Sequence, residues 1–345
     1  MNADLLLVID HSDTQVTLDG RALRVQRPDQ PPQHVPLGLL GLVVVQGKAL
    51  VACDVWRALA ERQIPAVLLP GRGLGASVWM GAALGTTVAL RTAQHRAADR
   101  LEWCLASARR LLAAKFSAQA RAAGLIDRGP APAARQADLL ARLDNAGQAL
   151  AKTETLAGLM GHEGAAAAAW YQDLAGCLPS HWHFQGRNRR PPRDTVNALL
   201  SLGYTLLGGE MLGAVQQAGL DPARGLLHEL VPGRESLVLD LIEPLRPSVA
   251  VVILGFLDQL LAPEDFTLGE HEGCLLAKAA RGRFYQAWAR ARQDWPDLHA
   301  ADTAADGLAL PVTSLAQLCR RQTELLRADL RSLMPVLGHR EGGAA

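Results

Sequence analysis

The hydrophobic pattern of the chain changes near Arg91, and this change constrains the fold more than any other feature of the sequence. Before Arg91, short Val- and Leu-rich segments alternate with turn residues, which is typical of strands. After it, apolar residues recur three or four positions apart over long segments, as on one face of a helix. We therefore expect an α+β fold, in which a small β-rich N-terminal domain (1–90) is joined to a larger all-α domain (91–345).

The individual elements follow from the same pattern. Strands are predicted at residues 5–9, 15–18, 22–25, 42–45 and 66–69, and one helix interrupts them at 54–63, with Asp54 placed to cap it. The Gly-rich segment at 71–75 lacks the Lys-Ser/Thr pair and the immediate helix of a phosphate-binding loop, so we interpret it as a turn. An Ala- and Arg-rich helical stretch reaches about Gly124. Further helices are predicted at 136–160, 162–178, 195–218, 236–260, 273–293 and 314–334.

Composition excludes several classes of protein. The 35 Lys and Arg balance 34 Asp and Glu, and this net charge of +1 excludes a uniformly basic nucleic-acid binder. The five cysteines lie far apart without a C-x-x-C pair, which excludes a zinc ribbon and a disulfide scaffold. The apolar run at 249–257 is much shorter than the roughly 20 residues of a membrane span, and the first residues lack the positive charge of a secretory signal. We expect a cytoplasmic protein with no membrane association.

Acids and a histidine mark the candidate chemistry. Glu163 lies in G-H-E-G (161–164) at the start of an Ala-rich helix, and His228 lies on a connection between helices. Asp240 and Glu243 stand three residues apart in a strongly apolar segment, so on a helix their carboxylates share one face. Acids in such a setting are costly unless they are paired or bound to a cation. Two carboxylates and one imidazole suit Mn²⁺ or Mg²⁺.

A structural alternative stays open, because no compact motif connects Glu163 to the later pair of acids. In that alternative, Asp240 pairs with Arg234 or Arg246, and His228 is a loop histidine whose hydrogen bonds are satisfied.

A basic run is the second candidate site. The segment 181–193 contains no acid, its aromatic residues could stack on bases, and it carries four arginines: Arg187, Arg189, Arg190 and Arg193. Two prolines at 191–192 prevent a helix, so we expect an exposed loop that ends at Asp194, a cap for the next helix. Basic residues also gather at 91–121 and 278–292. These clusters favour a polyanionic partner such as DNA, although solvated faces would have the same composition.

These segments together resemble the CRISPR-associated integrase/endonuclease family of spacer acquisition, the universal adaptation protein of prokaryotic CRISPR systems. The similarity is clearest in F-Q-G-R-N-R-R-P-P-R-D-T-V-N-A-L-L-S-L-G-Y-T-L-L (184–207). It continues in A-G-L-D-P-A-R-G-L-L-H-E (218–229) and L-V-L-D-L-I-E-P-L-R-P (237–247), and extends to L-R-T-A-Q (90–94) and K-F (115–116). The resemblance implies a β-rich N-terminal domain followed by a helical catalytic domain.

The resemblance also implies a reaction and its residues. Glu163, His228 and Glu243 would hold Mg²⁺ or Mn²⁺, and Asp240 would support them or act as an occasional ligand. The reaction would be a transesterification in which a 3′-hydroxyl of a short DNA duplex attacks a phosphodiester at the leader–repeat boundary and again at the other end of the repeat. His228 could alternatively help to move a proton. Asn197 would support the site through hydrogen bonds, and Tyr204 would either support it or pack in the core.

The resemblance implies partners as well. Integration at two strand ends requires two active sites at a fixed separation, so we expect a homodimer that associates through the N-terminal domain. Double-stranded DNA (prespacer and CRISPR repeat) and a small ferredoxin-like adaptation protein are the other expected partners. Two alternatives are a non-catalytic DNA-binding scaffold that uses the arginine clusters and an integrase of a related mobile element.

Overall fold

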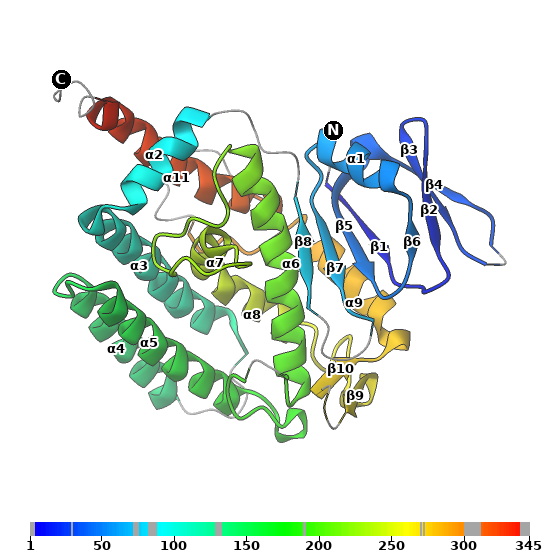
Figure 1. Cartoon of the computed structure of the whole chain (residues 1–345). Helices are drawn as coiled ribbons and strands as arrows, with labels where there is room; N and C mark the ends of the chain where they lie inside the picture. Colours follow the sequence, from blue (N-terminus) through cyan, green and yellow to red (C-terminus); the bar gives the residue numbers. More distant parts are fainter. Residues whose placement is uncertain are drawn as a thin grey trace.

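The structure of the chain is a computed structural model in which a β-rich region lies beside a larger helical region (Figure 1). It describes residues 4–28, 30–71, 76–81, 88–127, 133–188, 191–269, 271, 273–299 and 312–338, with side chains as far as residue 333 in the last helix. Most of the Gly-rich segment predicted as a turn at 71–75 lies outside these residues. Strands dominate the first 80 residues and helices the remainder, so the predicted α+β class is confirmed.

Two four-stranded sheets form the N-terminal region. The first has the order β1-β5-β7-β8, from β1 (Leu5–Ile9), β5 (Leu40–Gln46), β7 (Ala66–Leu69) and β8 (Val78–Met80). Its first three strands are parallel, and β8 is antiparallel to β7. The second sheet has the order β4-β3-β2-β6, from β2 (Gln15–Asp19), β3 (Ala22–Gln26), β4 (Gln33–Pro36) and β6 (Leu50–Val51). Five of these strands match the predicted ones. The sequence gives no signal for β4, β6 and β8, which are only two to four residues long.

The helix between β6 and β7 corrects one prediction. This helix, α1 (Cys53–Glu61), has Ala52 as its N-cap, so the prediction that Asp54 caps it is wrong. Asp54 lies in the first turn instead, where its carboxylate accepts a hydrogen bond from the N–H of Val55 at 2.9 Å. An acid in the first turn still stabilises the helix through the helix dipole.

Each face of the first sheet packs against a different layer, because neighbouring residues of a strand point to opposite sides. Val43 joins a core shared with α1 and the second sheet, whereas Leu42 and Val67 join the core of the helical region. The helix α6 (Thr195–Gln217) covers this second face. A Cβ atom on Gly209 of α6 would lie only 2.2 Å from Cγ2 of Val67, so a glycine is needed for the helix to approach the sheet this closely.

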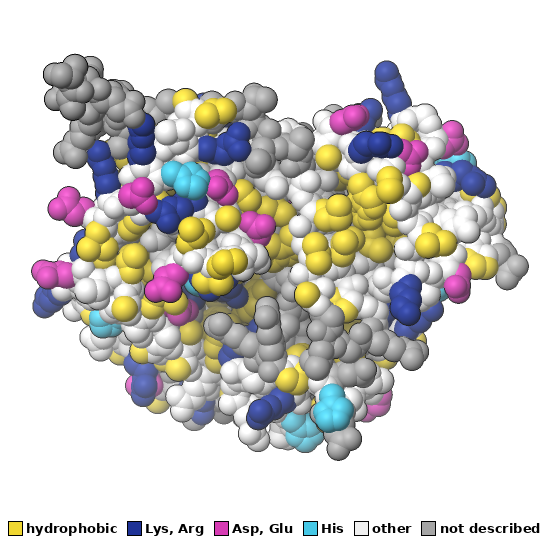
Figure 2. Space-filling model, in the orientation of Figure 1, with side chains coloured by type: hydrophobic (Ala, Val, Ile, Leu, Met, Phe, Trp, Pro, Cys, Tyr) yellow, Lys and Arg dark blue, Asp and Glu magenta, His cyan; other side chains and the backbone are white. Residues whose placement is uncertain are grey.

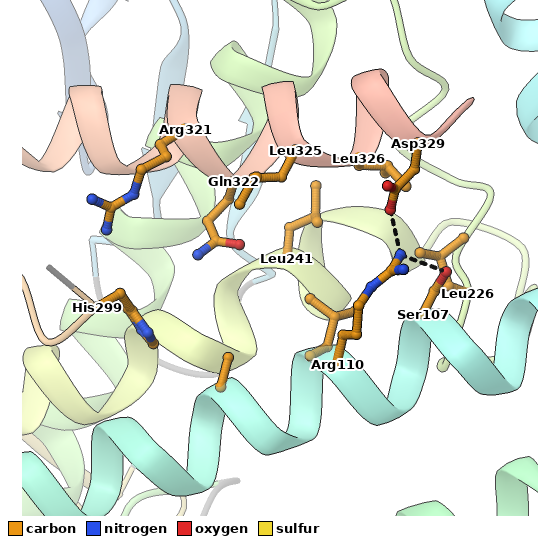
Figure 3. Close-up of a pocket in the computed structure, with 12 residues that line it drawn as sticks. Ser107, Arg110, Leu226, Leu241, His299, Arg321, Gln322, Leu325, Leu326 and Asp329 are labelled. Atoms are coloured by element: carbon orange, nitrogen blue, oxygen red, sulfur yellow. Dashed lines mark hydrogen bonds and ion pairs between the residues drawn. The ribbon is translucent and has the colours of Figure 1, made fainter. Parts of the chain in front are cut away.

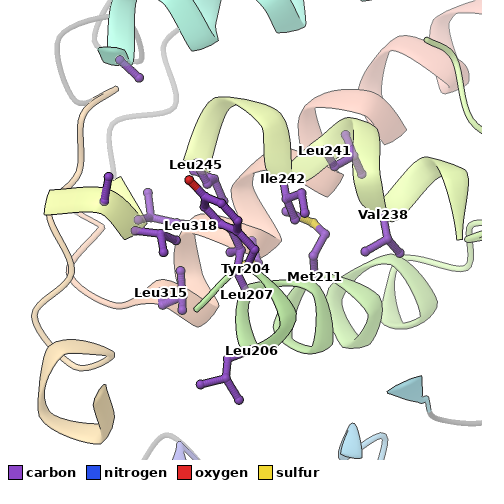
Figure 4. Close-up of a cluster of buried hydrophobic side chains, with 14 of the residues drawn as sticks. Tyr204, Leu206, Leu207, Met211, Val238, Leu241, Ile242, Leu245, Leu315 and Leu318 are labelled. Atoms are coloured by element: carbon purple, nitrogen blue, oxygen red, sulfur yellow. The ribbon is translucent and has the colours of Figure 1, made fainter. Parts of the chain in front are cut away.

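The helical region lies mostly on the side of α6 that faces away from the first sheet (Figure 1). Its other helices are α2 (Val88–Ala98), α3 (Leu101–Leu125), α4 (Ala133–Leu150), α5 (Leu156–Cys177), α7 (Ser236–Ile242), α8 (Arg246–Leu254), α9 (Lys278–Ala291) and α11 (Leu315–Gly338). Apolar side chains of α6, α7 and α11 meet in the core (Figure 4). By length and composition α6 could cross a membrane, but most of its residues are buried inside the protein.

The break predicted near residue 161 lies instead between Leu150 and Leu156, where Thr155 caps α5, so Glu163 stands inside this helix and not at its start. Prolines and glycines explain two other differences between predicted and observed helices. The helix predicted at 236–260 is interrupted at Ile242 by a 3₁₀ turn, Glu243–Leu245, because Pro244 has no N–H to continue the helix. The helix predicted at 273–293 begins only at Lys278. Its first residues form β10 (Gly273–Leu276), which pairs with β9 (Phe266–Gly269) in an antiparallel hairpin. Gly273 starts β10 with φ +74°, a conformation that a helix excludes.

Candidate active site

The loop before α7 is folded around one buried carboxylate. Asp240 is fully buried and accepts hydrogen bonds from the backbone N–H groups of Leu226 (2.5 Å), Leu227 (3.0 Å) and His228 (3.0 Å). Gly225 allows this approach, since a Cβ atom there would lie 2.8 Å from the carbonyl oxygen of His228 and 2.9 Å from Oδ2 of Asp240. The sequence G-L-L-H therefore forms a concave donor surface that fits one carboxylate.

Asp240 also holds the imidazole of His228. Nδ1 of His228 lies 2.5 Å from Oδ1 of Asp240, so the carboxylate fixes the ring orientation and favours a proton on Nδ1. No hydrogen bond to Nε2 is formed by the residues that the structure describes. The structural alternative fits in part: His228 is a loop histidine with a bonded Nδ1, but the partner of Asp240 is this histidine and not an arginine. Arg234 donates to the carbonyl oxygen of Glu229 and to Ser236, and Arg246 contacts Glu243.

The other two predicted acids meet at one buried lysine. Nζ of Lys115, on α3, donates to Oε1 of Glu163, on α5, and lies 2.5 Å from Oε2 of Glu243 in the turn after α7. Nε of Arg246 lies 2.9 Å from the other oxygen of Glu243, as an ion pair rather than a well-aligned hydrogen bond. Three segments that are far apart in sequence thus bring two carboxylates around one ammonium group.

The charges around Glu243 shift its titration. Burial would raise the pKa of this carboxyl group, but Arg246 and Lys115 together lower it to about 2, and His228 contributes in the same direction. For Lys115, burial would lower the pKa of the ammonium group, yet the two carboxylates outweigh it and raise the pKa. Glu243 and Lys115 are therefore both charged at neutral pH.

Aromatic side chains and a small cavity complete the site. The guanidinium groups of Arg246 and Arg187 lie 4.8 and 5.5 Å from the ring centre of Tyr204, whose hydroxyl is 2.8 Å from that of Tyr171. Burial, followed by the nearby Tyr171, raises the pKa of Tyr204 well above its usual range. These groups enclose about 20 Å³ beside Lys115, enough for one water molecule or ion.

The geometry does not by itself assemble the three predicted metal ligands. In the part of the chain that the structure describes, no three His, Cys, Asp or Glu side chains form a group that could hold a metal ion. Glu163 and Glu243 share the ammonium of Lys115, whereas His228 is held by Asp240.

The sequence comparisons identify the family. The family model described as CRISPR associated protein Cas1 matches residues 7–290. A CRISPR-associated endonuclease Cas1 of Rhodospirillum rubrum is 34% identical over 93% of this chain and 95% of its own length. One of Thermodesulfovibrio yellowstonii is 31% identical over 80% of this chain and 88% of its own length. The chain belongs to the Cas1 family. The resemblance inferred from the motifs is confirmed, and the relatives named as endonucleases bear out the prediction of an endonuclease.

Solved structures agree with the Cas1 fold. A Cas1 protein from Thermotoga maritima has a TM-score of 0.79 at 19% identity and covers 95% of this chain and 97% of its own. A casposase bound to its integration product has a TM-score of 0.78 at 20% identity, with 95% and 90% covered. A Cas6-RT-Cas1–Cas2 complex gives 0.76 at 24% identity, with 96% and 35% covered.

The arginine loop of this Cas1 family member divides into inward and outward residues. Asp194 caps α6, as predicted, by accepting a hydrogen bond from the N–H of Asn197 at 2.8 Å. Asn197 is fully buried and accepts a hydrogen bond from Arg187 at 2.7 Å, so Arg187 points into the wall of the site. Arg193 is exposed. The predicted DNA contacts Arg189 and Arg190 lie outside the described residues.

Lys115 and Arg246 are the functional candidates that sequence reasoning missed. A signal for Lys115 exists, because it stands three residues after Leu112 and next to Phe116, on the apolar stripe of its helix. A lysine on a buried stripe needs an acidic partner. Arg246 lies three residues after Glu243, a spacing at which helical side chains meet.

A larger cavity lies beside this site in the Cas1 fold. It encloses about 350 Å³ between α3, α7 and α11 and shares no lining residue with the site around Lys115. Gln322 points into it, and Arg110 contacts Asp329 across one end (Figure 3). Apolar side chains, among them Leu241 and Leu326, form much of its wall.

Proposed function

We propose that this Cas1 family member is a metal-dependent DNA integrase of spacer acquisition. A 3′-hydroxyl of a short DNA duplex would attack a repeat phosphodiester, and the same reaction would follow at the other end of the repeat. One observation carries this proposal. Two carboxylates from helices far apart in sequence, Glu163 and Glu243, meet around a single buried positive charge next to a histidine whose orientation is fixed.

The donor set suits a hard divalent cation. Carboxylate oxygens are the ligands that Mg²⁺ and Mn²⁺ prefer, and the ammonium of Lys115 marks a position where a cation lies between two of them. Glu163 and Glu243 would hold the metal, and His228 would join them through Nε2. When bound, the metal would polarise the scissile phosphoryl group and stabilise the leaving oxygen.

The remaining residues of the site position these ligands. Asp240 keeps the imidazole of His228 in one orientation, and the same contact favours Nε2 as the free acceptor, for a metal or for a proton. Asn197 fixes the loop through Arg187, which in turn lies over the ring of Tyr204. The wall of the site is thereby held rigid beside the reacting groups.

DNA and protein partners belong to the same proposal. Arg193, together with Arg189 and Arg190, would contact phosphates near the site. On the face seen in Figure 2, basic side chains are spread among acidic ones, so these contacts would be local rather than part of one large basic surface. Residues 1–90 would mediate a homodimer, and residues 91–345 would carry catalysis. A Cas2-type protein, small and ferredoxin-like, would bridge dimers, by analogy with the Cas1–Cas2 complex of similar fold.

A strand-transfer assay tests the proposal. The protein, its Cas2-type partner, Mn²⁺ and an end-labelled prespacer duplex are incubated with a plasmid that carries a CRISPR repeat, and label joined to the plasmid is measured. Glu163→Gln should abolish joining, whereas the matched control Glu154→Gln, at an exposed position of the same charge, should leave it unchanged.

The assay also separates the alternatives. A non-catalytic scaffold would bind the duplex equally well with or without a chelator and would join no label, and equal joining by Glu163→Gln and wild type would refute the assigned site. An integrase of a mobile element would prefer its own DNA ends over a prespacer. Curated relatives favour a role in CRISPR systems, since two CRISPR-associated endonucleases are 34% and 31% identical over most of the chain.

A further inference from the structure

Lys115 occupies the position between the two carboxylates. Its side chain is almost completely buried, and its ammonium group touches Glu163 on one side and Glu243 on the other. A buried ammonium is stable only with such partners, and the buried carboxylate of Glu243 and the partly buried one of Glu163 would repel each other without a cation. In this arrangement, Lys115 and Arg246 together balance the two negative charges.

Gln119 lies one helical turn after Lys115, and its side-chain oxygen has no hydrogen-bond partner among the described residues. Only 1% of its surface is exposed, yet its Oε1 atom accepts no hydrogen bond from the described residues. Gln119 lines the same small cavity as Lys115, Glu163 and Glu243. Residues four apart on a helix lie side by side, so a lysine ammonium can reach the amide oxygen of a glutamine at this spacing. The site thus contains an acceptor that is not used in the present arrangement.

Building on the proposed function, we propose that Lys115 is an internal counter-ion that holds Glu163 and Glu243 together until a divalent cation binds, and that Oε1 of Gln119 then accepts its ammonium group. A divalent cation and an ammonium group repel each other and cannot share the same pair of carboxylate oxygens. The long, flexible lysine side chain can turn aside while its helix stays in place. Lys115 and Gln119 are therefore positioning residues for the metal.

Mn²⁺ binding tests this exchange directly. The spectrum of free Mn²⁺ in electron paramagnetic resonance gives the dissociation constant for the full-length wild type and for Lys115→Met, Gln119→Leu and the double variant. Lys115→Met should bind Mn²⁺ more tightly, by about tenfold, because no ammonium must be displaced. Gln119→Leu should bind it several-fold more weakly, and this effect should disappear in the double variant. The control Lys152→Met, at an exposed position, should match the wild type.

Thermal unfolding provides a second measurement. In EDTA, Lys115→Met should melt at a lower temperature than the wild type, because Glu163 and Glu243 have lost their shared cation. Mn²⁺ should raise its melting temperature by more than it raises that of the wild type. If Lys115→Met does not fold, the Mn²⁺ affinity of Gln119→Leu relative to the wild type still tests the exchange, since leucine fills the space of the glutamine without adding charge.

Two results would overturn the exchange. One is Mn²⁺ binding to Lys115→Met that is no tighter than to the wild type, and the other is an equal effect of Gln119→Leu with and without Lys115. Failure of the proposed function has a different signature, because the wild type and Glu163→Gln would then bind Mn²⁺ alike. If the wild type binds Mn²⁺ through Glu163 but Lys115→Met binds no more tightly, only the exchange is wrong.

Discussion

Replacing Asp240 by asparagine should destabilise the protein by several kcal/mol. The buried carboxylate receives four donors, two at each oxygen, from Leu226 and Leu227 at Oδ2 and from His228 at Oδ1. In either orientation of the asparagine amide, its NH₂ group faces one of these donor pairs. A buried donor left without an acceptor costs about 1–3 kcal/mol, so two of them should lower the free energy of unfolding by about 2–6 kcal/mol.

Urea denaturation followed by tryptophan fluorescence measures this loss. The control Asp138→Asn removes an exposed carboxylate that pairs with Arg142 within one helix, and it should change stability by less than about 0.5 kcal/mol. A long-range ¹H–¹⁵N spectrum of the imidazole should show a proton on Nδ1 of His228 in the wild type. An unfolding free energy for Asp240→Asn within about 1 kcal/mol of wild type would refute the role assigned to this carboxylate.

Three further predictions concern the same site. The pKa of Glu243 falls to about 2 in the folded protein, so its charge stabilises the fold above pH 4.5, and this stabilisation is lost as pH falls toward 2. In urea denaturation measured at a series of pH values, Glu243→Gln should therefore remove about 3 kcal/mol of pH-dependent unfolding free energy. Gly225→Ala should destabilise by about 1–3 kcal/mol in the same measurement, whereas Gly161→Ala, where a Cβ meets nothing within 4 Å, should be neutral or stabilising. Asn197→Ala should cost about 2–4 kcal/mol, because it removes the buried amide oxygen that accepts from both Arg187 and the N–H of Asn188, and an unchanged melting temperature would contradict this.

Local sequence pattern predicts much of this fold, because most helices and strands are specified by the residues within them. The apolar strands β1, β5 and β7 and the cap of α6 at Asp194 depend on nearby residues, and all are found where the pattern places them. The β9–β10 hairpin differs, since the N–H of Cys274 bonds to the carbonyl oxygen of Pro192, a residue far away in sequence. Periodicity alone cannot anticipate such a tertiary contact.

In the candidate site, too, the sequence predicts the residues but not the tertiary contacts between them. The motifs single out Glu163, His228, Asp240 and Glu243 because acids and histidine are rare in apolar segments. How they pair depends on Lys115, which approaches from a helix about 50 residues before Glu163 and about 130 before Glu243. Sequence spacing cannot show that an ammonium group would stand where two carboxylates meet.

A crystal structure of the protein soaked with Mn²⁺, with anomalous data at the manganese edge, tests the central claim most directly. The account predicts one strong peak within coordination distance of the carboxylates of Glu163 and Glu243 and of Nε2 of His228, with the ammonium of Lys115 moved away from both acids. A manganese ion bound elsewhere, with Lys115 still between the two carboxylates, would contradict it.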